Sequence, residues 1–386
     1  MSSAIEQSSE EGNGQRMSLN QPICIFFCGD VMIGRGIDQI LPYPGNAILY
    51  ESYVRDAREY VALAEAANGP IPRPVDSAYV WGEALEELDR AGTDLRIINL
   101  ETSITVSEDA WPNKPVHYRM NPANVGCITA ARIDCCSLAN NHTLDWGYEG
   151  LAETMDALDK AGVTRAGAGT NRAEAASPAI LDALDKGQVV VLGIGSTTSG
   201  IPPSWTATED RPGIYLLDDL SEDAARRVTG EVRRLKGAGI IGVVSVHWGD
   251  NWGFSIPPEQ VEFAHRLVDE GVDVVHGHSS HHVKSIEVYR QRLILYGCGD
   301  FLTDYEGICG FEEFRSDLSL MYLTKFDSQG ELVELRIVPM QMKRFQLNRA
   351  SAADAQWLRD LLNDLGSPFG TSVQLREDNS LDLQWH

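Results

Sequence analysis

Short apolar runs rich in β-branched residues alternate with amphipathic stretches of helical period along most of the chain. The apolar runs predict β-strands, and the amphipathic stretches, several of which end at a glycine, predict helices. This alternation is typical of an α/β fold, in which helices cover the faces of a sheet. The predicted strands are Ile23–Phe27, Leu95–Ile98, Ile133–Leu138, Val189–Ile194, Ile240–Val246 and Val272–Val275. The predicted helices are Glu51–Ala66, Ala78–Arg90, Pro122–Ala131, Tyr148–Ala161, Glu222–Lys236 and Pro258–Glu270.

The pattern changes after Ser279, where two pairs of apolar runs each flank a short polar turn and predict β-hairpins. One more helix and two short strands follow near the end of the chain. We therefore expect a disordered N-terminal tail at residues 1–20, one main domain at residues 21–345 and a small C-terminal α+β extension at residues 346–386. The hairpin strands are Ser285–Tyr289 with Leu293–Tyr296 and Leu318–Phe326 with Leu332–Val338, and the last helix is Ala352–Leu365.

The composition is that of a folded protein with an acidic surface. Of the 386 residues, 43% are hydrophobic and 23% are charged, which excludes wholesale disorder. The net charge of -24 argues against nucleic acid or an anionic membrane as the main partner. No apolar run approaches the roughly 18 residues of a membrane helix, and the start of the chain lacks the features of a secretion signal. We expect a cytoplasmic protein with no membrane span and no nucleic-acid partner.

The cysteines are odd in number and form no Cys-x-x-Cys pair. Most of them lie in apolar segments, so we expect buried free thiols and neither disulfides nor zinc ligands. They are Cys24, Cys28, Cys127, Cys135, Cys136, Cys298 and Cys309.

Side chains with metal-binding atoms follow five of the predicted strands. In an open α/β sheet, ligands bind beyond the carboxyl ends of the strands, so residues far apart in the sequence converge there. Carboxylate, amide and imidazole groups together suit a borderline divalent ion, and the lack of cysteine argues against a closed structural zinc site. The five strand ends carry Gly29-Asp30, Asn99-Leu100-Glu101, Asn140-Asn141-His142, His247-Trp248-Gly249 and the run from His276 to His282.

Each of these signals has a simpler interpretation when it is taken alone. A Gly-Asp pair after a strand is commonly a turn, and Asn141 with its neighbours could cap a helix that begins near Gly147. The run from Gly277 to His282 is the stronger signal, because glycine permits a tight turn that lets two imidazoles face one ion. The five signals in this order favour a metal site.

Six longer motifs also occur in a fixed order. They are GDVMIGR (Gly29–Arg35), NLET (Asn99–Thr102), LANNH (Leu138–His142), HWG (His247–Gly249), GHSSH (Gly277–His281) and IEVYRQRLILYGCGDFL (Ile286–Leu302). Together they resemble the CapA (poly-γ-glutamate capsule synthesis) family, a branch of the calcineurin-like metallophosphoesterase superfamily. The resemblance spans roughly residues 23 to 310 and implies a sandwich of two β-sheets flanked by helices.

The resemblance also implies a metal centre of one or two divalent ions, with Mn²⁺ as the leading candidate and Zn²⁺, Fe²⁺ and Co²⁺ as alternatives. Whether both metal positions are filled is left open, because Met32 stands where these phosphoesterases carry the histidine of an Asp-x-His motif. The implied ligands are Asp30 and His281 for the first ion, Glu101 for a bridging or neighbouring position, and Asn141, His247 and His278 for the second ion.

His142 matches the catalytic histidine of the superfamily, which would protonate a leaving group or stabilise charge. His276 and His282 flank the ligand cluster, and we expect them on other faces, away from the metal. Arg35 could pair with a phosphate or carboxylate through its planar fork, or it could be a solvated arginine at the start of a helix.

A basic island in the acidic chain, Lys114 with His117 and Arg119, would select an anionic substrate. Trp248 and Trp252 either form a wall of the pocket or pack in the core. The polar residues after the last hairpin strand either support the metal ligands from behind or lie on the surface. They are Asp300, Asp304, Tyr305 and Glu306.

Three functions are compatible with these features. The first is a metal-dependent hydrolase that acts on a phosphoester or on an acidic amide-linked peptide or polymer such as poly-γ-glutamate, with a metal-activated water and His142. The second is metal-assisted epimerisation at a peptide α-carbon on the same fold. The third, suggested by the family resemblance alone, is a non-catalytic accessory role in capsule assembly.

Overall fold

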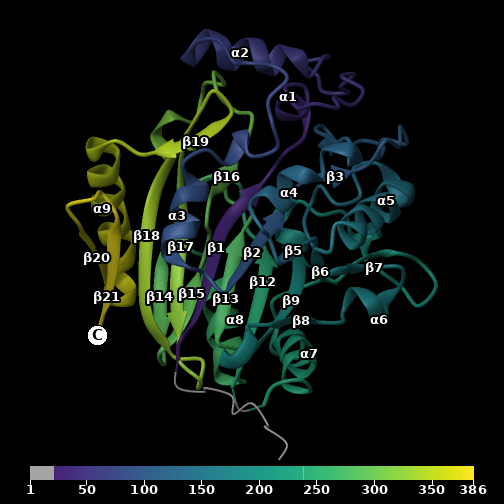
Figure 1. The fold of residues 1–386 in the computed structure, drawn as a ribbon. Helices are drawn as coiled ribbons and strands as arrows, with labels where there is room; N and C mark the ends of the chain where they lie inside the picture. Colours follow the sequence, from purple (N-terminus) through teal and green to yellow (C-terminus); the bar gives the residue numbers. More distant parts are fainter. Residues whose placement is uncertain (1–20, 238) are drawn as a thin grey trace, which may run out of the picture.

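Side chains along β1 (Ile23–Val31) point alternately into two hydrophobic cores. Ile25 and Phe27 enter a core that also contains residues of a second sheet, whereas Phe26 and Cys28 enter a core beneath helices on the other face. A strand buried on both faces must be covered on both sides. The computed structural model, which describes residues 21–237 and 239–386, therefore has helix, sheet, sheet and helix layers (Figure 1).

The larger sheet has ten strands in the order β20-β21-β18-β17-β1-β2-β5-β6, with β16 beside β1 and β19 beside β18. Its centre is parallel, since β1, β2, β5 and β6 run the same way, and β17 and β18 add an antiparallel half. The strands after β1 are β2 (Leu95–Leu100), β5 (Cys135–Ser137), β6 (Thr164–Ala166), β16 (Asp300–Leu302), β17 (Leu318–Phe326), β18 (Leu332–Lys343), β19 (Gln346–Arg349), β20 (Thr371–Leu375) and β21 (Leu381–Trp385).

The smaller sheet has seven strands in the order β11-β9-β12-β13-β15-β14, with β8 beside β9. Two short ribbons, β3 with β4 and β7 with β10, lie outside both sheets. The strands of the smaller sheet are β8 (Ala179–Asp182), β9 (Gln188–Ser196), β11 (Leu216–Leu217), β12 (Ile240–His247), β13 (Val274–His278), β14 (Ile286–Tyr289) and β15 (Arg292–Leu295). Those of the ribbons are β3 (Ser103–Ile104), β4 (Arg119–Met120), β7 (Ala168–Gly169) and β10 (Gly213–Ile214).

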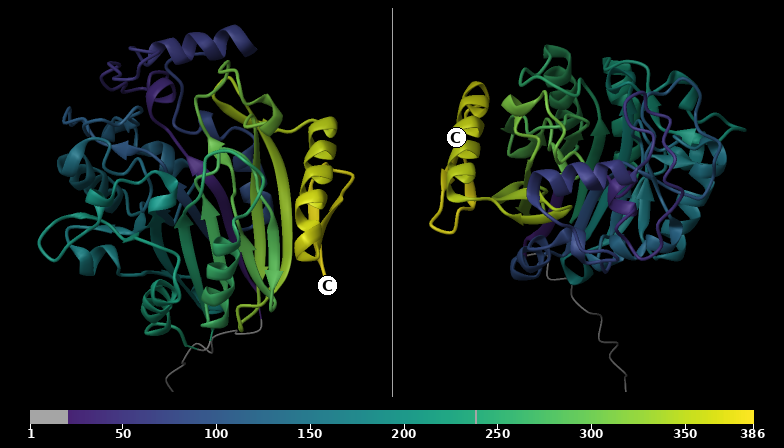
Figure 2. Two further views of the ribbon diagram at one scale, coloured as in Figure 1. Left: turned by 180° about the vertical axis from the view of Figure 1, so that it is seen from behind. Right: turned by 90° about the horizontal axis from the view of Figure 1, so that it is seen from above.

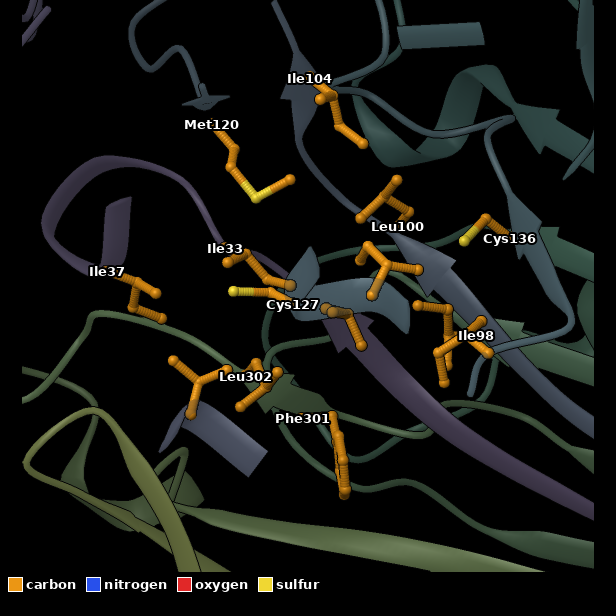
Figure 3. Packing of buried hydrophobic residues seen from close by; sticks show 14 of the residues in the cluster. Ile33, Ile37, Ile98, Leu100, Ile104, Met120, Cys127, Cys136, Phe301 and Leu302 are labelled. Atoms are coloured by element: carbon orange, nitrogen blue, oxygen red, sulfur yellow. The ribbon is translucent and has the colours of Figure 1, made fainter. Parts of the chain in front are cut away.

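Helices cover the outer face of each sheet. Ile98 and Leu100 of β2 pack beside Cys127 and Met120 on the outer face of the larger sheet (Figure 3), and α7 and α8 cover the smaller sheet through a third core. The helices are α1 (Arg35–Asp38), α2 (Arg58–Asn68), α3 (Ala84–Ala91), α4 (Gly126–Ala130), α5 (Gly147–Lys160), α6 (Arg172–Ala175), α7 (Glu222–Arg233), α8 (Pro258–Asp269) and α9 (Ala352–Gly366).

The C-terminal helix α9 lies along the edge of the larger sheet, beside the hairpin of β20 and β21 (Figure 2). β21 pairs with β18, and Leu358 and Leu362 of α9 enter the core between the sheets. The predicted tail at residues 1–20 falls outside the described residues. Within those residues, no helix combines the length and apolarity needed to cross a membrane.

The predicted α/β class and both predicted hairpins are confirmed. Three predicted helices are shorter than expected. The one predicted at Pro122–Ala131 is α-helical only over Gly126–Ala130, after a 3₁₀ turn at Pro122–Asn124. The one predicted from Glu51 begins only at Arg58, and the one predicted at Ala78–Arg90 is interrupted at Gly82, whose φ of 45° no helical residue adopts. All seven cysteines are free as expected, although Cys309 is exposed.

Candidate metal centre

Sheet register brings the candidate ligands together at the strand ends. In the larger sheet, Asp30 on β1 lies opposite Asp300 on β16 and Asn99 on β2. In the smaller sheet, His247 at the end of β12 lies opposite His278 at the end of β13. The two rows meet between the sheets, where Oδ1 of Asp30 is 3.8 Å from Nδ1 of His278.

Two groups of side chains have the spacing of cation sites. One is Asp30 with His247 and His278, and the other is Asp30 with His281 and Asp300. Within each group the ligand atoms lie within 4.8 Å of one another. Because Asp30 belongs to both groups, two neighbouring cations bound here would share its carboxylate.

Asn141 and Glu101 lie beside the group of Asp30, His247 and His278. Oδ1 of Asn141 is 3.1 Å from Nε2 of His247, and Oε1 of Glu101 is 3.9 Å from the same nitrogen. Glu101 does not complete either three-residue group, but it faces both His247 and His142 across the centre.

The centre contains carboxylate oxygens that the protein leaves unsatisfied. Oδ2 of Asp30 and Oδ2 of Asp300 are buried, and neither has a hydrogen-bond partner in the described part of the chain. An unpaired buried carboxylate oxygen is costly. Oxygen and imidazole donors together suit a borderline divalent cation, so these residues fit a metal ion by their own chemistry.

The ionisation of the carboxyl groups is strongly perturbed. Burial, and then the charge of Asp300, raise the pKa of Asp30 to about 7. Burial, and then the charge of Asp30, raise the pKa of Glu101 well above its ordinary value. Burial lowers the pKa of His247 and His278 well below the ordinary value. Both imidazoles are therefore neutral at pH 7, which is the form that binds a metal.

Further side chains fix the ligands in place. Nδ2 of Asn99 donates to Oδ1 of Asp30 at 2.7 Å, and Oγ of Ser245 lies 3.0 Å from Nε2 of His278. Burial lowers the pKa of His281, but the Asp300 carboxylate, 2.9 Å from its Nδ1, more than offsets this and raises the pKa. Such contacts orient a metal-binding ring and set its tautomer.

The two flanking histidines, His276 and His282, do not reach the centre. The strand pattern placed His276 on another face than the one it occupies. His276 is on the same side of β13 as His278, since Oγ of Ser245 contacts both rings. Its other nitrogen is 2.7 Å from the carbonyl oxygen of Cys28, so both nitrogens are engaged. His282 contacts the carbonyl oxygen of Val283 and packs among aromatic rings.

His142 is held by an aspartate three residues later in the chain. Its Nδ1 is 2.6 Å from Oδ2 of Asp145. Burial raises the pKa of Asp145 to about 6, so this carboxylate is ionised at neutral pH and Nδ1 carries the proton. Burial, and then the charge of Lys114, lower the pKa of His142 well below its ordinary value. The neutral ring thus presents Nε2, 3.9 Å from Glu101, to the centre.

A cavity of about 1200 Å³ opens onto the centre. Asn141, His142 and His281 lie in its wall, and hydroxyl, amide and aromatic side chains form much of the rest. A cavity of this size accepts a ligand larger than a single small ion. The other residues that line it include Tyr53, Tyr118, Thr197, Thr198, Ser199, Asn251, Trp252, Tyr305 and Phe311.

Arg35 lines the cavity, but its side chain is buried and mostly occupied by protein groups. Its guanidinium donates to the carboxylates of Asp304 and Glu51 and to the hydroxyl of Tyr60. These bonds use four of its five donor protons. The interpretation of Arg35 as a solvated arginine was therefore wrong, because its partners come from distant segments. Its pairing with a substrate anion stays a prediction.

The basic island does not act as one anion-binding surface. Nζ of Lys114 is in the cavity wall but contacts Oδ1 of Asp145 at 2.8 Å and Nδ1 of His142 at 3.1 Å. Arg119 is buried, donates to the carbonyl oxygens of Ser107 and Asn46, and does not line the cavity. His117 is also buried and contacts the carbonyl oxygen of Trp111.

The two tryptophans have different places. Trp248 is buried in the core of the smaller sheet and donates from Nε1 to the carbonyl oxygen of Tyr296 at 2.9 Å, so its predicted role in substrate binding is wrong. Trp252 does line the cavity. Its ring lies 5.3 Å from that of His281 and stacks on Phe311 at 3.9 Å.

Comparisons with known proteins agree with the motifs. The family described as bacterial capsule synthesis protein PGA_cap matches residues 24–305. The chain belongs to this family. The matched segment contains every candidate metal ligand, from Asp30 to Asp300.

Three relatives illustrate the range of this PGA_cap family. A "probable polyglutamine synthesis accessory protein" of Mycobacterium tuberculosis is 48% identical over 363 residues, which are 94% of this chain and 96% of that protein. The capsule biosynthesis protein CapA of Bacillus anthracis is 24% identical over 285 residues, covering 74% and 61%. The PGA biosynthesis protein CapA of Bacillus subtilis is 25% identical over 349 residues, covering 90% and 79%. The predicted resemblance to the CapA family is confirmed.

Sequence reasoning on this PGA_cap chain missed Asp300 as a candidate ligand. The signal was present, because Gly299-Asp300 repeats the Gly29-Asp30 pair. Asp304 and Glu306 are not surface acids either. Asp304 binds Arg35, and Glu306 accepts from the backbone nitrogens of residues 344 and 345. Asp145 and Tyr118 carried no motif of their own.

The shared carboxylate leads to a prediction about stoichiometry. Asp300→Asn removes one ligand from a single group, so we expect the purified protein to lose one of two bound Mn²⁺ ions, whereas Asp30→Asn affects both groups. Elemental analysis after dialysis measures this directly. Asp250→Asn is the control, because Asp250 lines the cavity without belonging to either group. Unchanged metal content in Asp300→Asn would remove Asp300 from the ligand set.

The raised pKa of Asp30 leads to a prediction about pH. Above pH 7 this carboxyl is ionised and ready for a cation, whereas below pH 7 the cation must displace a proton. The affinity for Mn²⁺ should therefore fall at least about tenfold from pH 8 to pH 6, with protons released on binding at the lower pH. Calorimetric titration of metal-free protein in two buffers measures both effects. An affinity that is flat over this range contradicts the assignment.

Proposed function

We propose that this PGA_cap protein is a metal-dependent hydrolase with the architecture of the calcineurin-like metallophosphoesterases, and that its substrate is an amide-linked peptide or polymer. The main support is the pair of buried ligand groups that share Asp30, with unsatisfied carboxylate oxygens on Asp30 and Asp300. The two face-to-face sheets, with candidate ligands at the strand ends, agree with that architecture.

Different residues of the centre would hold the two cations. Asp30, Asp300 and His281 would hold one cation, and the remaining candidate ligands would hold a second beside it. A bound divalent cation supplies positive charge and lowers the pKa of water toward about 7. The second set consists of His247, His278 and Asn141 with the shared Asp30, and Glu101 lies alongside.

His142 is the proposed catalytic base and acid. Asp145 holds the proton on Nδ1, so Nε2 is free to accept a proton from the attacking water. The imidazolium that forms is stabilised by the Asp145 carboxylate, and Nε2 then passes the proton to the leaving amine. The oxygen of water ends on the carbonyl carbon, and the amide C–N bond breaks.

The cavity favours an amide substrate over a phosphate ester. Phosphate recognition commonly relies on a guanidinium fork that is free to bind. Here Arg35 is bound to Asp304 and Glu51, and Arg315 in the cavity wall is bound to Asp317 and Asp354. The rest of the polar wall combines hydroxyl and amide groups, which pair well with peptide bonds, with two lysines and several carboxylates; the charged residues are Lys114, Lys343, Asp250, Glu306 and Glu312. The names of the Bacillus relatives, which refer to capsule and PGA biosynthesis, point to the same class.

An activity screen tests the proposal. Mn²⁺-loaded protein should release amine from γ-glutamyl peptides or poly-γ-glutamate and should act more slowly on phosphomonoesters and phosphodiesters. The same reactions run in D₂O separate a second chemistry, because deuterium at an α-carbon without cleavage would assign epimerisation instead. Bound metal with no turnover of any substrate would favour the accessory role named for the mycobacterial relative.

Variants of His142 and of Asp145, which contacts its ring, test the mechanism more sharply. His142→Ala should lower kcat by about 10² to 10⁴-fold, and Asp145→Asn should also lower kcat because it no longer fixes the tautomer. The Mn²⁺ content should stay at the wild-type value in His142→Ala. His265→Ala is a matched control, since His265 also contacts a carboxylate, that of Glu287 at 2.9 Å, but lies outside the cavity. Wild-type turnover by His142→Ala would remove this residue from the mechanism.

A further inference from the structure

Two tyrosines form the cavity wall between His142 and the candidate ligand His281. The ring of Tyr118 stacks on the ring of His142, with centroids 3.8 Å apart, and the ring of Tyr305 meets the ring of His281 edge-on at 5.5 Å. The hydroxyl oxygens of the two tyrosines are 2.5 Å apart. The pair thus joins the proposed catalytic side of the cavity to the metal side.

A count of protons shows that the pair has a donor to spare. Each phenol carries one proton, and the bond between the two hydroxyls uses one of them. Over residues 21–237 and 239–386, neither hydroxyl has another hydrogen-bond partner. Tyr118 is only 3% exposed, whereas Tyr305 is partly exposed to the cavity. Either hydroxyl can donate in this bond. Because Tyr305 is the more exposed of the two, we assign Tyr118 as the donor, which leaves the proton of Tyr305 available to the cavity.

The pair is also rigidly held. The backbone nitrogen of Tyr118 donates to Oδ2 of Asp145 at 2.6 Å, the same oxygen that holds His142. The guanidinium carbon of Arg35 lies 4.8 Å from the ring centroid of Tyr118 and 5.6 Å from that of Tyr305. A hydrogen-bond donor whose position is fixed in advance stabilises negative charge that develops on a nearby oxygen.

We propose that Tyr305, supported by Tyr118, binds the substrate oxygen on which negative charge develops. This rests on the proposed function. When water attacks the amide carbonyl carbon, a C–O bond forms and the electron pair of the carbonyl π bond moves to the carbonyl oxygen. The hydroxyl of Tyr305 donates a hydrogen bond to that oxygen and keeps its own proton. When the C–N bond breaks, the electron pair returns and the carbonyl re-forms.

Inorganic phosphate is a suitable probe, because it is a tetrahedral oxyanion that needs no turnover. Calorimetric titration of phosphate into Mn²⁺-loaded protein should show about tenfold weaker binding for the double variant Tyr118→Phe with Tyr305→Phe, the loss of one hydrogen bond to a charged group. Tyr305→Phe alone should account for most of this loss, and Tyr118→Phe for less. Titration of Mn²⁺ in the absence of phosphate should give the wild-type result for all three variants.

Tyr296→Phe is the matched control. Tyr296 is buried and its hydroxyl donates to Oε2 of Glu287 at 2.6 Å, but it does not line the cavity, so its loss should leave phosphate affinity unchanged. The rings are kept in every variant, so a role in packing alone predicts no change in phosphate affinity.

Three results overturn the proposal. Phosphate affinity of the double variant within about twofold of wild type would show that no hydrogen bond is lost, and a larger loss in Tyr118→Phe than in Tyr305→Phe would take the donor role from Tyr305. Wild-type protein that binds Mn²⁺ but not phosphate would also overturn it, with the hydrolase proposal intact. Wild-type protein that binds no Mn²⁺ would remove the proposed function and this inference together.

Discussion

The burial of three carboxyl groups in one place is the constraint on which the site depends. Asp30, Glu101 and Asp300 are each at most 3% exposed, and in the described part of the chain no lysine or arginine forms an ion pair with any of them. A buried charge without a partner costs several kcal/mol. Without a cation the protein can relieve this only by protonation, which is what the raised pKa values of Asp30 and Glu101 describe. A divalent cation would relieve it directly, and its binding would then be coupled to folding stability.

The pairing register of the strands, and the close approach of two of them, bring these carboxyl groups together. β16 contributes only three residues, yet its pairing with β1 places Asp300 beside Asp30. The approach is possible because Gly29 has no side chain, since a Cβ there would lie 1.6 Å from the carbonyl oxygen of Gly299. The Gly-Asp pairs are thus not merely turns. The glycines let two strands touch, and the aspartates then share one centre.

The sequence predicted which residues on the long parallel strands gather in one place, because each strand end is a local signal and all such ends meet at one edge of the sheet. It predicted poorly wherever a partner is supplied by a distant segment. Arg35 looks like a solvated arginine until Glu51 and Asp304 come to it through the fold. Trp248 follows the candidate ligand His247 yet turns into the core. Asp300 was missed as a candidate ligand because β16 is too short to give a strand pattern.

The residues on the metal side of the cavity and those on the opposite side differ in how freely they can be substituted among relatives. On the metal side, the ligands sit at strand ends, where a shift of one position would turn each side chain to the other face of its sheet. On the other side, Tyr53, Tyr305 and Phe311 lie on connecting segments, which tolerate change far better. Under the proposed function, relatives that are only 24% to 25% identical to this chain could keep the same metal site while the connecting segments change what the cavity accepts. Substrate differences among relatives should accordingly lie in these connecting segments and not in the ligand set.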